Sequence, residues 1–110
     1  MQKNIKIGEE IIPMRATAAT AYRYRQVFRS DLLIELTKED TPDAAKVETF
    51  QRLAYIMAAT AAGEDMNALS EAGYLEFLDR FDYMDLIEAM PEVVGLYISS
   101  KSNTSQAKKK

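Results

Sequence analysis

The segment between Pro42 and Gly63 limits the folds open to this chain more than any other part of the sequence. Its apolar residues recur at helical spacing, and Asp43 after a proline is a typical helix start. We therefore predict one long helix over 44–62, with Gly63 ending it. Ile56 lies outside the main apolar stripe, so this central helix should be buried on more than one side. The stripe consists of Val47, Phe50, Leu53, Ala54, Met57, Ala58 and Ala61.

The N-terminal residues predict a short β-hairpin over 3–15. Apolar and polar residues alternate on both sides of Gly8-Glu9, and this pair fits a two-residue turn. Pro13 cannot donate a hydrogen bond to a strand ladder, so the second strand should lie at an edge. Because an isolated hairpin is only marginally stable in water, we expect it to pack against the helices.

Shorter helices separated by polar breaks are expected in the rest of the folded part. One helix should begin at Thr17 or Thr20, a short apolar segment follows at 32–36, and Ser70 is a typical N-cap for a further helix. These elements and the hairpin define the fold class as mainly α. We predict a single small helical domain over 1–98 with a short N-terminal β-hairpin.

The last part of the chain contains a proline that predicts a helix boundary. A short helix from Asp82 or Tyr83 should run to about Met90, and Pro91 fits the first turn of a separate last segment. Residues 99–110 hold no core-forming side chain apart from one alanine. We expect them to form a disordered, lysine-rich tail.

The composition removes most catalytic chemistries. The chain has no Cys and no His, which excludes thiol nucleophiles, imidazole bases, disulfides and Cys/His zinc sites. Asp79, Asp82 and Asp85 recur every three residues, but a calcium loop alternates its ligands around a glycine, and catalytic carboxylates need a pocket that shifts one pKa. We interpret these acids as a solvated helix surface. The sequence therefore predicts a protein that is not an enzyme, without catalytic, cofactor-binding or metal-ligating residues.

Charge is distributed unevenly behind the formal net value of −3. Residues 1–30 carry six basic and two acidic side chains, whereas residues 31–100 carry four basic and fifteen acidic ones. An acidic body argues against nucleic-acid binding, and no apolar run is long enough to span a membrane. We expect a soluble cytoplasmic protein whose oppositely charged segments attract each other within one chain or between chains.

One tyrosine and two arginines form a cluster in the first predicted helix. Tyr22, Arg25 and Arg29 share a face, and two like charges four residues apart repel unless an anionic group faces them. The arginines could pair with the acidic second half of the same molecule. Alternatively, the three residues form a docking patch, because Tyr and Arg are favoured at interfaces. In that case the acidic, aromatic segment 79–88 is the expected complement in self-association.

Methionines and alanines indicate further contact surfaces. Met57 belongs to the predicted core, whereas Met66, Met84 and Met90 are candidates for an adaptable apolar groove, because the flexible thioether chain fits varied partners. The alanines of the central helix would permit the close approach of a neighbouring backbone; they are Ala54, Ala58, Ala59, Ala61 and Ala62.

The order of the segments resembles a known family. A hairpin runs into RATAATAYRYRQVFRSDLL, an alanine-rich helix contains RLAYIMA, and an acidic, aromatic stretch reads FLDRFDYMDLIEAMPEVVGLY. Together they resemble the tail assembly chaperones of long-tailed, siphovirus-type phages and prophages of Gram-positive bacteria. The resemblance covers roughly residues 3–98 and rests on the succession and composition of segments, since none of its motifs is catalytic.

The resemblance implies a small helical, non-enzymatic protein that binds and solubilises the tape measure protein while the tail tube assembles around it. It also implies self-association into a homo-oligomer in the host bacterial cytoplasm and absence from the mature virion. Some members of the family have a longer, frameshifted form that recruits the tail-tube protein, and Lys108-Lys109-Lys110 would suit such a shift.

A different class of protein is compatible with the same residues. The basic N-terminal segment could belong to a small regulatory or adaptor domain, for example one associated with transcription. Salt-sensitive DNA binding by residues 1–36 would distinguish this alternative from a chaperone.

Overall fold

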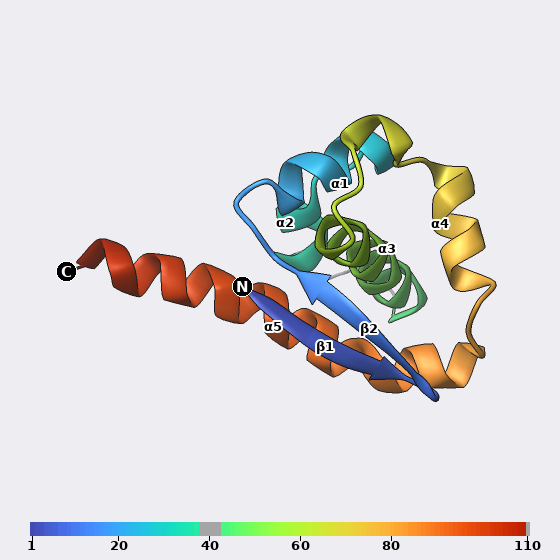
Figure 1. Cartoon of the computed structure of the whole chain (residues 1–110). Helices are drawn as coiled ribbons and strands as arrows, with labels where there is room; N and C mark the ends of the chain where they lie inside the picture. The colour runs from blue at the N-terminus through green and yellow to red at the C-terminus, as the bar shows by residue number, and fades with distance from the viewer. Residues whose placement is uncertain (38–42, 110) are drawn as a thin grey trace.

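Figure 1 shows the computed structural model, which describes residues 1–37 and 43–109. Over these residues the chain is mainly helical, with an antiparallel two-stranded hairpin at its N-terminus, as the sequence predicts. The central helix and the start of the fourth helix agree with their predicted bounds to within a residue or two. In chain order the elements are β1 (Gln2–Ile7), β2 (Glu10–Arg15), α1 (Thr20–Phe28), α2 (Leu32–Thr37), α3 (Asp43–Ala61), the 3-10 helix η1 (Met66–Ala68), α4 (Glu71–Leu78) and α5 (Tyr83–Lys109).

The hairpin forms around the predicted two-residue turn. Ile7 pairs with Glu10, which leaves Gly8 and Glu9 between the strands, and Gly8 has a φ of 63° that a β-branched residue would adopt only with strain. One face of the hairpin is buried, with β1 against α5 and β2 against α3. This face supplies four apolar side chains to the core, namely Ile5, Ile7, Ile12 and Met14.

Helix α3 passes through the middle of the molecule, as predicted for the central helix (Figure 1). Five consecutive side chains from Leu53 to Met57 are buried, which covers every side of the helix. Ile56 is therefore in the core although it lies outside the apolar stripe. Phe50, a member of that stripe, is only partly buried.

The C-terminal part differs from the prediction. Pro91 lies inside one continuous helix, α5, and does not begin a separate segment. A proline removes one helical hydrogen bond, but Met90 and Val93 on either side of it are both buried, so packing holds the two halves in line. Helix α5 continues through Lys109, over the residues of the predicted tail, and extends away from the body in Figure 1. Adding residues to an established helix costs far less than starting one.

Truncation of a core side chain of α3 tests the register of this helix. Leu53 is fully buried, so Leu53→Ala should lower the free energy of unfolding by about 2–5 kcal/mol, through lost burial and a residual cavity. Leu75→Ala is the matched control, because Leu75 on α4 is 59% exposed. Urea denaturation followed by circular dichroism measures both values. A loss below about 1 kcal/mol at Leu53 would contradict its burial.

Candidate functional site

A surface groove with a volume of about 650 Å³ lies between β2, α3 and α4. Its floor is formed by the alanines at the end of α3, and its apolar walls come from β2 and α4. The sequence predicts that these alanines permit the approach of a neighbouring backbone, yet within this chain Ala58, Ala61 and Ala62 face the groove. The lining consists of Glu10, Ile11, Ile12, Pro13, Tyr55, Ala58, Ala59, Ala61, Ala62, Glu64, Ala68, Gly73, Glu76, Phe77 and Arg80.

Aromatic rings pack between α4 and α3 beside this alanine groove. The Tyr55 ring of α3 lies with its centroid 5.9 Å from those of Tyr74 and Phe77 on α4. Phe28 of α1 contacts Tyr74 edge-on at 5.1 Å. These rings form one cluster of tilted and edge-to-face contacts, and such contacts stabilise beyond their buried area. Tyr55 and Phe77 of this cluster also line the groove beside the alanines.

Tyr55 joins the aromatic cluster to the start of α4. Its hydroxyl oxygen accepts a hydrogen bond from the Ser70 backbone N–H at 3.3 Å, and the Ser70 hydroxyl caps α4 by accepting from the Gly73 N–H at 3.0 Å. A Cβ atom at Gly73 would lie 2.5 Å from the Tyr55 hydroxyl oxygen. Glycine is therefore required sterically at this position although its φ is ordinary.

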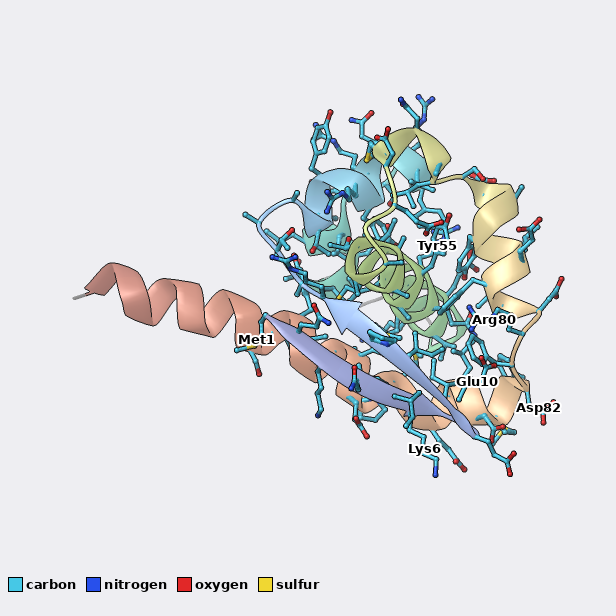
Figure 2. All side chains as sticks on the ribbon, in the orientation of Figure 1. Met1, Lys6, Glu10, Tyr55, Arg80 and Asp82 are labelled. Atoms are coloured by element: carbon cyan, nitrogen blue, oxygen red, sulfur yellow. The ribbon has the colours of Figure 1, made fainter. Side chains whose placement is uncertain are left out.

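Charged side chains border the groove. Arg80, which follows α4, donates to Glu10 of β2 at 2.8 Å, and Figure 2 shows the two side chains directed toward one another from these elements. Glu64 follows α3, and Glu76 lies on α4. Burial raises the pKa of the Tyr55 hydroxyl, and the negative charges of Glu64 and Glu76 raise it further. Both carboxylates line the same groove as Tyr55.

A second polar cluster joins α1, α2 and α3, and the sequence analysis did not identify it. Glu35 of α2 accepts hydrogen bonds from the hydroxyls of Tyr24 at 3.0 Å and Thr49 at 2.7 Å. The guanidinium of Arg52 lies 5.0 Å from the centre of the Phe28 ring. Only the contact between residues distant in sequence reveals this cluster, because Glu35 in isolation looks like an ordinary surface carboxylate.

The protonation states of this cluster favour a structural role. Burial raises the pKa of Glu35, but hydrogen bonds from Ser30, Thr49 and Tyr24 and the charge of Arg52 outweigh it, so the pKa lies below its usual value. Burial, reinforced by the Glu35 charge, raises the pKa of Tyr24. At neutral pH the carboxylate is therefore ionised and the phenol is protonated. Neither group is poised to transfer a proton near neutral pH.

The basic patch of Tyr22, Arg25 and Arg29 lies on the exposed side of α1 and at its end. Tyr22 is 56% exposed, both arginines are exposed, and neither arginine forms an ion pair within the described part of the chain. The alternative in which these arginines pair with the acidic half of the same molecule therefore finds no support in the described residues. Arg29 adopts a left-handed conformation with a φ of 56° and ends the helix.

The three methionines predicted for an apolar groove are not equivalent. Met84 is 63% exposed at the start of α5, and Met66 in η1 is partly buried against the core. Met90 is only 5% exposed, because it lies on the face of α5 that packs into the core. None of the three lines the alanine groove. In residues 1–37 and 43–109, Asp79, Asp82 and Asp85 belong to no cluster that could hold a metal ion.

Comparison with protein-family models, curated proteins and solved structures gives no significant match for this chain. Among the described residues, no helix has both the length and the apolar character needed to cross a membrane. The site is therefore defined by its own geometry: an alanine floor, aromatic and aliphatic walls, and a charged border.

A double-mutant cycle tests the close approach of Gly73 to Tyr55, both of which line the groove. Gly73→Ala should destabilise the protein, because the new methyl group meets the Tyr55 hydroxyl. In a Tyr55→Phe background the same change should be neutral or stabilise by up to about 1 kcal/mol, since alanine is the better helix former. Urea denaturation of the four proteins gives the coupling free energy. Equal effects of Gly73→Ala in both backgrounds would contradict the contact.

Proposed function

We propose that this chain is a non-enzymatic assembly chaperone that binds an aggregation-prone helical partner and keeps it in solution. The alanine groove is the observation on which this proposal rests. Small side chains let the axis of a partner helix approach the axis of α3 to about 8 Å. The binding of an amphipathic helix in an apolar groove is a recurring mode of protein recognition. Ile11 on the wall is 64% exposed, so the groove presents apolar surface to solvent.

The resemblance found in the sequence identifies the partner within this proposal. We propose that the partner is the tape measure protein of a long-tailed phage or prophage, and that the chaperone holds it while the tail tube forms. In this role the protein works in the host bacterial cytoplasm and is absent from the mature virion. A longer, frameshifted form that recruits tail-tube protein remains part of the proposal.

Self-association through the basic patch accompanies this function. The complementary segment 79–88 is acidic and exposes Tyr83 and Met84, both 63% accessible. In Figure 1, α1 and the link between α4 and α5 lie far apart on the molecule. The two surfaces therefore cannot meet within one chain. A contact between the basic patch of one copy and segment 79–88 of another copy is heterologous. Repeated contacts of this kind form rings or open chains.

Co-expression tests the chaperone function directly. The soluble fraction of the tape measure protein should increase when the wild-type chain is present, because the groove covers an apolar helix. Ala62→Trp should reduce this effect, since the indole would fill the groove from an exposed position. Ala72→Trp, at an exposed alanine outside the groove, is the control and should retain the effect. An insoluble fraction that is the same with and without the wild-type chain would refute the proposal.

Charge reversal tests the self-association. Arg25→Glu combined with Arg29→Glu should weaken association, because both substitutions oppose segment 79–88, and added salt should weaken the wild-type contact in the same direction. Lys6→Glu combined with Lys46→Glu changes the net charge equally at other sites and is the control. Sedimentation velocity over a concentration series measures association, and circular dichroism verifies helicity. Unchanged sedimentation of the arginine variant would exclude the patch.

A further inference from the structure

The charged border of the alanine groove has an excess of carboxylates. Among the described lining residues there are three acidic side chains and one basic side chain, and Arg80, the basic one, is already paired with Glu10. Glu64 and Glu76 form no ion pair within the described part of the chain. A ligand that enters the groove therefore meets two uncompensated negative charges and no free positive charge among these residues.

The two carboxylates belong to different elements but border the same groove. Glu64 lies in the loop after α3, Glu76 lies on α4, and both act electrostatically on the hydroxyl of Tyr55, which itself lines the groove. Figure 2 places Tyr55 in the space between α3 and α4. Because Tyr55, Glu64 and Glu76 all line this groove, a positive charge that enters it beside Tyr55 would interact with both carboxylates.

The charges determine which helices the groove accepts. A helix with only apolar residues would bring low-dielectric material over two ionised groups without compensating them, and removing charges from water in this way is unfavourable. A helix with a carboxylate at the same place would add repulsion. A helix with Lys or Arg would compensate both groups while the aliphatic stem of that side chain lies along the apolar wall.

We propose that the groove binds an amphipathic helix of another protein whose small apolar residues face the alanines and whose Lys or Arg lies between Glu64 and Glu76. This inference rests on the proposed function and adds to it the sign of the charge that the partner helix carries. The border thus acts as a specificity element. It selects basic amphipathic helices against acidic ones with the same apolar stripe.

Two synthetic peptide probes test this selection on the full chain. Both have the same helical stripe of Ala and Leu, and they differ only in carrying Lys or Glu beside it. Fluorescence anisotropy at low salt should give a Kd for the Lys peptide about tenfold lower than for the Glu peptide, as expected for one compensated charge pair. Glu64→Gln combined with Glu76→Gln should abolish the difference.

The control is Glu71→Gln combined with Glu88→Gln, which removes two exposed carboxylates outside the groove and should preserve the preference. Equal binding of both peptides by the wild-type chain, or an equal loss in the control, would overturn the inference, as would no binding of either peptide. If Glu64→Gln with Glu76→Gln disrupts self-association and the Lys peptide does not compete with it, the occupant is a second copy and the inference is wrong.

Co-expression separates this inference from the proposed function. If the variant with Glu64→Gln and Glu76→Gln keeps the tape measure protein as soluble as the wild-type chain does, the charge selection is wrong while the chaperone function stands. The opposite outcome is also possible to distinguish. If the wild-type chain fails to solubilise the tape measure protein but still prefers the Lys peptide, the charge selection is right and the assignment of the tape measure protein as partner is wrong.

Discussion

Burial of the middle of α3 on every side is the constraint on which the rest of this fold depends. The five consecutive buried side chains from Leu53 to Met57 leave no face of this part of the helix for water, so neighbours must cover it all round there. The hairpin covers one side through β2, while α1, α2, α4 and α5 cover the others. Each of these neighbours is too short or too weakly amphipathic to be stable alone. Their stability comes from the shared contact with α3.

The Glu35 cluster shows how the smallest of these neighbours is held. Helix α2 has six residues and buries only Leu32 among its apolar side chains, so apolar contact contributes little to its position. The hydrogen bonds to Glu35 from α1 and α3 replace the missing contact area. A charge-assisted hydrogen bond is about twice as strong as a neutral one, which suits a helix that offers few apolar side chains.

The sequence predicts what depends on local pattern and misses what depends on distant contacts. The turn at Gly8-Glu9 and the bounds of α3 follow from spacing, glycine and proline, and the structure confirms them. Pro91 is a correct local signal for a boundary, but packing on both sides of it overrides that signal. Met90 illustrates the same limit. Its burial depends on which elements of the chain pack against α5, and local sequence does not show this.

The alanine groove could be predicted from the sequence only in part. Alanine spacing in α3 indicates a surface for close approach, but the sequence does not reveal that aromatic rings pack between α3 and α4 beside it. Nor does it place Glu64 and Glu76 on the border of one groove. The family resemblance supplies a role for such a groove, and that role stands as a proposal.

The pairing of β1 with α5 determines when this chain can complete its fold during synthesis. The first strand leaves the ribosome early, whereas the helix that buries Ile5 and Ile7 follows all the other described elements in the chain. The nascent β1 strand therefore exposes apolar side chains until α5 emerges, and contacts of such long sequence separation slow folding. Lys3 and Lys6 on this strand disfavour edge-to-edge pairing with other chains in that interval. A protein proposed to protect a partner from aggregation thus carries a safeguard for its own first strand.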